Sequence, residues 1–388
     1  MSTSRQPLWI ANLIFPVAAR YGVLYYFTCM KMGLLLFALF CGTSLCAQRF
    51  LYKGRIGDQP VVMQLDTGGG SAHAQYFFWN RKKLVSLDGG RSSNGLLKLT
   101  DFRQTQTLEL TLRGRSYTGT WTKGGRKMKI GLKPASLSEY ANRYDVFKSV
   151  RDWKNEWPID YVVSSGYVFQ KIRTDTLNGY VVERLREKYT GVLTVRIAGA
   201  QTPATVRINN KLLEEAIIRA MGASECLGAS DGAHNMVIDK LYINSDVLSV
   251  GFYATAYCGG DHPGEISDAY NFDRRTGRLL HLNDVLWLGG KAPPAEGSTE
   301  YYGYRDSVLA PWLLEIFSRL YPSQISGREC PYDSESAWQD FKWCFTKEGL
   351  YIGPQFVHAA SACNNPGWPV IPYFIVRRYK NPKSRLAF

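Results

Sequence analysis

Acidic residues are absent from the first 47 positions, which hold only three basic ones, Arg5, Arg20 and Lys31. Residues 30–48 have a basic start, an apolar core of about ten residues and small residues before Ala47, which is the layout of a secretory signal. The core is shorter than the roughly 20 residues that a membrane-spanning helix needs. We therefore expect residues 1–47 to be a signal region that is cleaved near Ala47.

A second apolar segment, residues 8–28, precedes this signal. One interpretation is that translation starts at Met30 or Met32, so that the signal is terminal. The alternative is a membrane hairpin of residues 8–28 and 33–47, which would anchor the protein. The first interpretation predicts an exported, periplasmic protein.

Residues that build common active sites are also scarce. No His-Glu-x-x-His helix occurs, which argues against the metalloproteases that use it. The Gly-x-Ser-x-Gly pattern occurs at Gly228–Gly232, but it follows the expected helix 209–221 and does not lead from a strand into a helix, as the elbow of a hydrolase does. No Cys-x-x-Cys pair offers a zinc site, and the signatures of nucleic-acid-binding folds are missing. We predict no metal, no cofactor and no nucleic-acid partner, and the sequence gives no indication of the oligomeric state. Only five histidines are present: His73, His234, His262, His281 and His358.

No cysteine lies between positions 47 and 225, and the five that follow all lie in the C-terminal half. In an oxidising compartment they predict two disulfides and one free thiol. A Cys226–Cys258 bridge would tie a helix to a strand, at about 3 kcal/mol of stabilisation. Cys330–Cys363 is the second expected bridge, leaving Cys344 buried in an apolar strand. The alternative pairs Cys344 with Cys363.

Charge is distributed unevenly. Residues 48–150 contain 18 Lys and Arg against 7 Asp and Glu, whereas residues 151–388 contain 26 of each. The basic part reads as short alternating strands about ten residues apart, separated by Gly, Asp, Asn and Ser turns. Gly68–Gly70 fits a hairpin loop between two of them. The expected strands are 50–56, 61–65, 74–79, 84–87, 96–99, 107–112, 117–121 and 127–132. They predict an antiparallel barrel or sandwich over residues 48–140.

The cations of this region fall at turns and on alternating strand positions. One interpretation is a solvated surface; the other is a surface for an anionic partner such as lipopolysaccharide, membrane headgroups or an acidic wall polymer. The residues concerned are Arg81, Lys82, Lys83, Arg113, Arg115, Lys123, Arg126, Lys127, Lys129 and Lys133. Among them Arg126, Lys127 and Lys129 are the candidate binding residues.

Residues 141–388 are expected to form an α+β domain with an antiparallel sheet and packed helices, so the chain as a whole is α+β. Expected strands are 161–163, 167–172, 190–197 and 247–256; expected helices are 178–188, 209–221 and 307–320. The helix 209–221 is predicted to be capped by Asn209 or Asn210 and to end at Gly222. Residues 289–304, rich in Gly, Pro, Ala and Tyr, are expected to be a loop that forms part of a binding face.

The run Tyr257-Cys-Gly-Gly-Asp-His-Pro263 follows the strand 247–256. Next come a strand at 270–272, a turn at Asp273–Gly277 and a short helix from Asp284, with Asn283 as its cap. The pattern Cys-Gly-Gly-Asp-His-Pro followed by Tyr-Asn-Phe-Asp-x-x-Thr-Gly-x-x-Leu-x-Leu-x-Asp resembles an exported bacterial domain of unassigned activity. That domain occurs in lysozyme-binding anti-sigma factors and before the catalytic domain of some peptidoglycan deacetylases. The resemblance covers about 205–376 and includes 345–352 and 370–373.

The resemblance implies non-catalytic binding in the cell envelope, with a protein such as lysozyme or a cell-wall glycan as ligand. The deacetylase motifs, a metal-binding Asp and a His-x-x-x-His pair, are absent from this chain. Tyr257, Asp261 and His262 are the candidate binding residues of this stretch. The alternative is that the Gly-Gly-Asp-His-Pro run only shapes a turn, within which Asp261 and His262 form hydrogen bonds. A different hypothesis is a hydrolase of envelope polymers that uses Asp261 and His262. A third is an immunity or scaffold protein for one cognate partner.

Overall fold

The structure, a computed structural model, describes residues 50–68, 70–290, 292–327 and 329–387. The predicted signal, the alternative start sites and the membrane hairpin lie outside these residues. None of the helices in the described part combines the length and the apolar character that a bilayer crossing needs.

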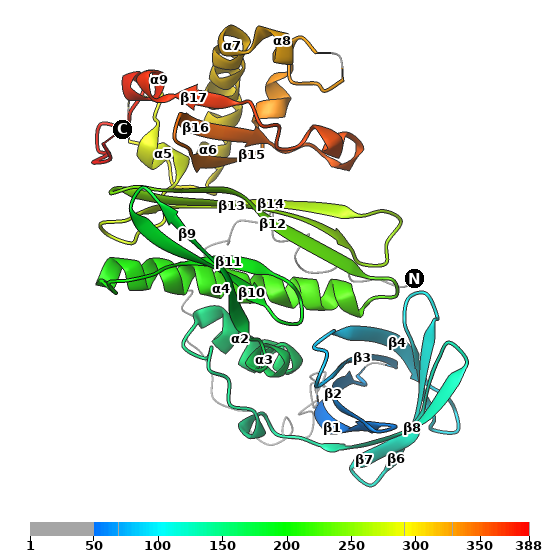
Figure 1. The fold of residues 1–388 in the computed structure, drawn as a ribbon. Helices are drawn as coiled ribbons and strands as arrows, with labels where there is room; N and C mark the ends of the chain where they lie inside the picture. The colour runs from blue at the N-terminus through cyan, green and yellow to red at the C-terminus, as the bar shows by residue number, and fades with distance from the viewer. Residues whose placement is uncertain (1–49, 69, 291, 328, 388) are drawn as a thin grey trace, which may run out of the picture.

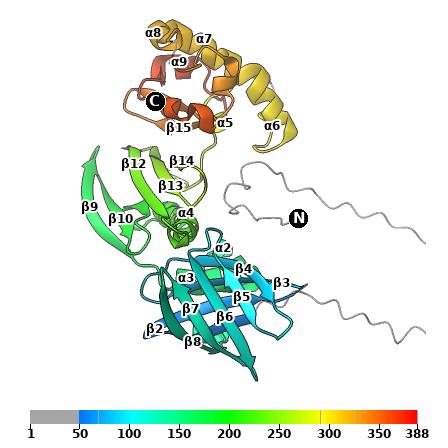
Figure 2. The same cartoon turned by 90° about the vertical axis from the view of Figure 1, so that its right-hand side faces the viewer.

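The described chain begins with a closed antiparallel barrel, in which each strand pairs with the next and β8 returns to β1 (Figures 1 and 2). The strands are β1 Phe50–Ile56, β2 Gln59–Asp66, β3 Ser71–Phe78, β4 Val85–Arg91, β5 Leu97–Thr100, β6 Gln106–Arg113, β7 Ser116–Lys123 and β8 Arg126–Pro134. Each expected strand is present, and the barrel alternative is the correct one. Ile56, Leu87 and Leu99 are fully buried inside it, as the alternation of apolar and polar positions requires.

One predicted surface cation is not on the surface. Lys82, in the β3–β4 connection, is 2% exposed, because its neighbours hold this connection against the helices that follow the barrel. Ser224 donates its hydroxyl to the Lys82 carbonyl oxygen, and the Leu84 N–H donates to the Ser224 carbonyl oxygen at 3.0 Å.

Helices α2 (Lys148–Glu156) and α3 (Pro158–Ser165) follow the barrel. The predicted strand at 161–163 is wrong, since these residues lie in α3. Pro158 begins the helix, and the side chain of Gln64 accepts a hydrogen bond from the Ile159 N–H at 3.1 Å. The helix is buried between the barrel and the middle of the molecule, so its sequence lacks the polar face that marks a surface helix.

A three-stranded antiparallel sheet comes next, formed by β9 (Phe169–Leu177), β10 (Tyr180–Glu187) and β11 (Leu193–Ile197). The helix predicted at 178–188 is wrong, because Asn178 and Gly179 turn the chain into a hairpin. Their φ angles are +48° and +80°, the pattern of an Asn-Gly hairpin turn.

The long helix α4 (Pro203–Gly228) packs against β4 of the barrel, helix α3, β11 and the next sheet along the chain (Figure 1). It starts before the predicted helix, with Thr202 as its cap, and it continues through Gly222. Asn209 is not a cap: its side chain exchanges two hydrogen bonds with the backbone of Ile197 at the edge of β11, at 2.8 and 3.0 Å. The start is therefore set by another local signal, the Thr202 cap followed by Pro203, whereas at the other end the helix continues past the local stop signal, Gly222.

The sheet of β12 (Ala233–Ile243), β13 (Val247–Tyr257) and β14 (Gly264–Asp273) lies between α4 and the C-terminal sheet (Figures 1 and 2). Polar groups join the two sheets. Lys342, whose side chain is 1% exposed, pairs with Asp239 at 2.6 Å, and Ser249 accepts a hydrogen bond from the Phe345 N–H at 2.9 Å.

The C-terminal layer packs helices around a small antiparallel sheet with its own apolar core. Its elements are α5 Leu282–Val285, α6 Thr299–Tyr304, α7 Ala310–Leu320, α8 Pro322–Ile325, β15 Phe341–Phe345, β16 Gly349–Pro354, β17 Val370–Pro372 and α9 Tyr373–Arg378. The cap of α5 is His281, not Asn283. Part of the loop expected at 289–304 is helical, since Ser298 caps α6.

Both expected disulfides are present among the described residues, Cys226–Cys258 and Cys330–Cys363, and Cys344 is buried and free. The alternative Cys344–Cys363 pairing is therefore wrong. Burial raises the pKa of the Cys344 thiol to about 12, so this thiol is not a reactive nucleophile at neutral pH. The disulfides indicate an oxidising, extracytoplasmic environment.

Candidate functional site

The predicted stretch 257–263 lies where the barrel contacts the end of β13. Arg103, in the β5–β6 loop, donates to the carbonyl oxygens of Gly259 and Gly260, both at 3.2 Å. Its guanidinium also contacts the hydroxyl of Tyr257. Tyr257 therefore has a partner within the molecule, and the backbone of the glycine pair serves the contact between the barrel and the rest of the chain.

Asp261 and His262 remain exposed at the tip of this stretch. The His262 ring stacks on the ring of His358, with centroids 3.5 Å apart. Within the described chain Asp261 takes part in no hydrogen bond or ion pair, so the expected internal hydrogen bonds of the turn are not formed there. The geometry does not place Asp261 against His262 in the way a carboxylate orients a catalytic imidazole.

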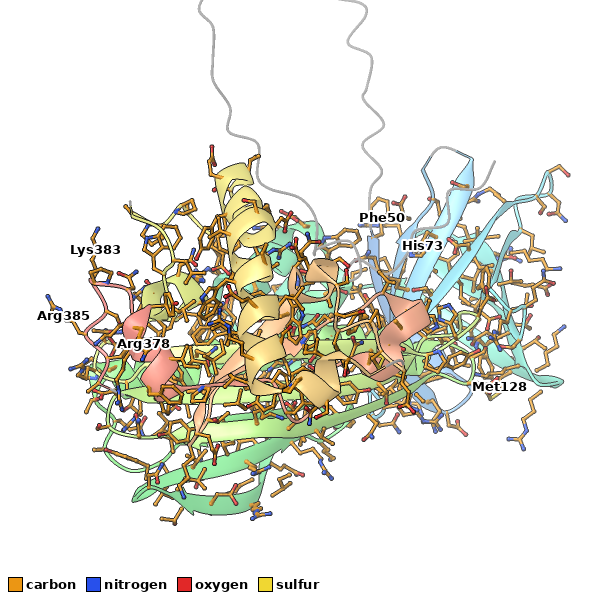
Figure 3. All side chains as sticks on the ribbon, turned by 90° about the horizontal axis from the view of Figure 1, so that it is seen from above. Phe50, His73, Met128, Arg378, Lys383 and Arg385 are labelled. Carbon is orange, nitrogen blue, oxygen red and sulfur yellow. A yellow bond between two sulfur atoms is a disulfide. The ribbon has the colours of Figure 1, made fainter. Side chains whose placement is uncertain are left out.

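Arg126, Lys127 and Lys129 occupy the start of β8, and all three are exposed. They lie far from the basic C-terminal segment that contains Lys383 and Arg385. Figure 3 shows Met128, between two of them in sequence, on the barrel side, with Lys383 and Arg385 at the opposite side. The cations at the start of β8 and the basic C-terminal segment therefore do not form one surface.

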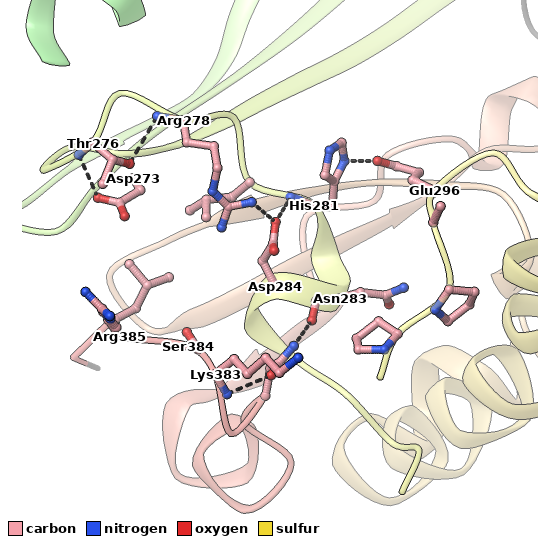
Figure 4. A pocket seen from close by; sticks show the side chains of 16 residues that line it. Asp273, Thr276, Arg278, His281, Asn283, Asp284, Glu296, Lys383, Ser384 and Arg385 are labelled. Carbon is pink, nitrogen blue, oxygen red and sulfur yellow. Dashed lines mark hydrogen bonds and ion pairs between the residues drawn. The ribbon is translucent and has the colours of Figure 1, made fainter. Parts of the chain in front are cut away.

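A pocket of about 500 Å³ lies in the C-terminal layer (Figure 4). Three segments distant in sequence meet there: the turn and helix 273–284, the segment 293–296 and the C-terminal segment 381–386. Its lining residues are Asp273, Thr276, Arg278, Leu280, His281, Asn283, Asp284, Pro293, Pro294, Ala295, Glu296, Asn381, Lys383, Ser384, Arg385 and Leu386. The expected binding loop supplies one wall.

Local sequence fixes the first wall of this pocket. The Asp273 carboxylate accepts hydrogen bonds from the N–H groups of Arg275 and Thr276 at 2.8 and 3.3 Å. Gly277 has a φ of +74°, as predicted for this turn. A Cβ at Gly277 would lie 2.6 Å from the Ala204 carbonyl oxygen, so the turn packs closely on the first turn of α4.

Charged groups of both signs line the pocket. Asp284 pairs with Arg278 at 2.9 Å and accepts the His281 N–H at 2.9 Å. His281 also contacts the carboxylate of Glu296. Partial burial lowers the pKa of His281, and the carboxylate of Asp284 opposes that shift.

Several polar groups in the pocket lack partners within the described chain. The side-chain oxygen of Asn283 and the hydroxyl of Ser384 are buried without a hydrogen bond. Asn283 is only 7% exposed. The side chains of Lys383 and Arg385 are exposed and form no ion pair with a described residue. Buried polar atoms normally have partners, and these two have none within the described chain. The exposed side chains of Lys383 and Arg385 are the groups that a bound ligand can reach directly.

The pocket was not predicted as a unit, because its segments are far apart in sequence. Arg278, Asn283 and Asp284 lie inside the stretch that the resemblance covers, whereas Lys383–Leu386 lie beyond it. The basic run at the end of the chain, from Arg377 to Arg385, was the one available signal.

No family model and no curated protein matches the chain. One structural match is the crystal structure of a DUF3298 family protein from Pseudomonas aeruginosa, with a TM-score of 0.30 and 14% identity, over 55% of this chain and 96% of the other.

Proposed function

We propose that this chain is a non-catalytic binding protein of the cell envelope, whose ligand is a protein or a cell-wall glycan held at the C-terminal pocket. The main support is a pocket in which the exposed side chains of Lys383 and Arg385 form no ion pair with a described residue. The disulfides fit an exported protein, and the proposal places it in the periplasm after removal of a signal peptide.

The chemistry of the pocket defines what a ligand offers. Lys383 and Arg385 suit carboxylate or other anionic oxygens. Amides, hydroxyls and carboxylates occur together in peptides and in the amino sugars of cell walls. No described residue of the pocket supplies a nucleophile hydrogen-bonded to a base, which is why binding is favoured over hydrolysis.

Calorimetry on the oxidised, mature protein tests this proposal. The probes are a lysozyme, chosen because of the sequence resemblance, and soluble muropeptides with intact stem peptides, each at two salt concentrations. Saturable binding of either probe should weaken about tenfold or more in K383A/R385A, because two charge-assisted contacts are lost.

The matched control is R91A/R113A, which removes the same charge from exposed barrel positions. It should leave this binding nearly unchanged. Equal loss in both variants would show that net charge and not the pocket governs binding. Turnover of the muropeptides would contradict the non-catalytic assignment.

A further inference from the structure

We propose that the outside of the barrel carries a second, independent binding site, for an acidic polysaccharide. The site is an open groove that has Trp79 and Tyr140 as an aromatic platform and the outward lysines of β8 as an approach. It does not depend on the C-terminal pocket, so either proposal can fail alone.

The groove has a volume of about 510 Å³ and lies between the outer face of the barrel and the segment that follows it. Lys53, Val62 and Trp79 line it from the barrel, and Tyr140 and Ser165 line it from beyond. Junctions between packed units are common places for ligand sites.

Trp79 is held in place while remaining accessible. Its side chain is 39% exposed, and its ring centroid lies 5.9 Å from that of Tyr140, with the planes tilted by 37°. The buried amino group of Lys82 lies 3.4 Å from the indole centroid and so packs against the ring. A fixed, partly exposed indole beside a tyrosine offers an apolar surface with polar edges, which suits the C–H face and the hydroxyls of a sugar ring.

Charge at the groove is positive and incompletely balanced. Lys53 and Lys133 lie directly opposite each other on β1 and β8. Two like charges at such positions repel each other and destabilise the sheet. Lys53 is neutralised by Glu139, whose other oxygen accepts the Ser136 N–H at 2.9 Å. No acidic residue of the described chain pairs with Lys133, which leaves one cation free to meet an anionic ligand.

This free cation continues a row along β8. Lys127, Lys129 and Lys133 point outward, whereas Ile130 and Leu132 point into the barrel. Outward positions recur about every 7 Å along a strand, and position 131 of the row is a glycine. Threonine hydroxyls border the row, because Thr122 and Thr120 on β7 lie opposite Lys127 and Lys129. A polymer with repeating carboxylates can therefore extend from the aromatic platform along these lysines.

The experiment measures binding of the full mature protein, with its disulfides intact, to hexagalacturonate as a defined acidic oligosaccharide. Maltohexaose serves as the neutral comparison, and phosphatidylglycerol vesicles as the membrane comparison. We expect hexagalacturonate to bind saturably and to weaken with salt, and maltohexaose to bind at least about tenfold more weakly.

Two variants separate the site from net charge. K127A/K129A/K133A should weaken hexagalacturonate binding about tenfold or more, whereas R91A/K98A/R113A, with the same charge removed from β4 to β6, should change it less than about twofold. W79A should weaken it about fivefold or more. If W79A shows no cooperative thermal unfolding transition, and is therefore not folded, Y140A tests the same platform.

Equal weakening by the two triple variants would overturn the proposal in favour of a diffuse field. Unchanged binding in both W79A and Y140A would overturn the role of the platform. Binding to vesicles without binding to hexagalacturonate, abolished by K127A/K129A/K133A, would assign the row to a membrane surface instead.

Discussion

The barrel and the C-terminal layer solve the problem of strand edges in different ways. In the barrel every strand of β1 to β8 has two partners, so closure pairs the backbone N–H and C=O groups of every strand. No cysteine of the described chain lies in the barrel. The later sheets have three strands each and therefore open edges. They are held by the described disulfides and by buried polar pairs such as Lys342–Asp239. Closure leaves the outer barrel surface free to be strongly basic, whereas the later layers are charge-balanced because many of their charges pair internally.

The largest effect on stability is expected from breaking the Lys342–Asp239 ion pair, which joins two of the later sheets. Lys342→Met should lower the free energy of unfolding by about 3 kcal/mol, because it leaves the Asp239 carboxylate with only the more distant Lys240 as a partner. Denaturant unfolding measures the change. Asp239→Asn added to Lys342→Met should recover part of the loss, and a double variant no better than the single one would contradict the pairing.

Removing a disulfide should have the next largest effect, again outside the barrel. C226S/C258S should cost about 2–4 kcal/mol, because the bridge closes a loop with a sequence separation of 32 residues. Thermal unfolding with and without reductant checks this. Reductant should affect the unfolding transition reported by Trp121 in the barrel much less than that reported by Trp338 in the C-terminal layer. Each signal is the difference in fluorescence between the unmodified protein and its Trp121→Phe or Trp338→Phe variant.

The junction between barrel and α4 should respond to pH. Burial raises the pKa of Glu225 from 4.5 to about 7, so the folded chain keeps a proton that the unfolded chain releases. Stability should fall as pH rises from about 4.5 to 7. Burial lowers the pKa of Lys82 from 10.5 to about 7, so the unfolded chain keeps a proton that the folded chain lacks. Stability should then rise from pH 7 to about 10.5.

Each of these two limbs is expected to be at most about 1.4 kcal/mol per pH unit. Chemical unfolding at pH 5, 7 and 9 measures them. Glu225→Gln should remove the lower limb alone and Lys82→Met the upper limb alone. A profile unchanged in both variants would place the pH dependence elsewhere.

The smallest effect is expected at the exposed tip of the 257–263 stretch. D261A/H262A should change stability by less than about 0.5 kcal/mol, since both residues are exposed and their one ring contact is with exposed His358. Ligand binding at the C-terminal pocket should be unaffected. Loss of turnover of an envelope polymer in this variant would instead support the hydrolase hypothesis.

Prediction from sequence succeeded where the local pattern carries the information. The barrel strands alternate inward apolar and outward polar residues between turn residues, so each was identified. It failed where burial on all sides removes the alternation, as in α3, or where tertiary contacts extend an element, as in α4 beyond Gly222. At Asn178–Gly179 the Asn-Gly hairpin signal is stronger than the helix propensity of the residues that follow, and the structure forms the hairpin.

The sites divide in the same way. The Cys226–Cys258 pair was predicted because the helix before Cys226 and the strand before Cys258 are recognisable in the sequence. The C-terminal pocket was not, because Asn283 and Ser384 are brought together by the fold across about a hundred residues of sequence. The groove was also not predicted. Lys53, Trp79 and Tyr140 come together only because the segment that follows β8 packs against the outside of the barrel.

Gly228, at the end of α4, has a consequence for how the two proposed sites act together. A Cβ there would lie 1.9 Å from the Leu84 carbonyl oxygen of the barrel, and the same helix end is bonded through Cys226 to β13. The end of the helix thus joins the barrel to the β12–β14 sheet, on which the C-terminal layer packs. A polymer long enough to occupy both sites would meet the second at a high and constant effective concentration, so that two weak sites would give strong retention on a repetitive surface and little on short fragments.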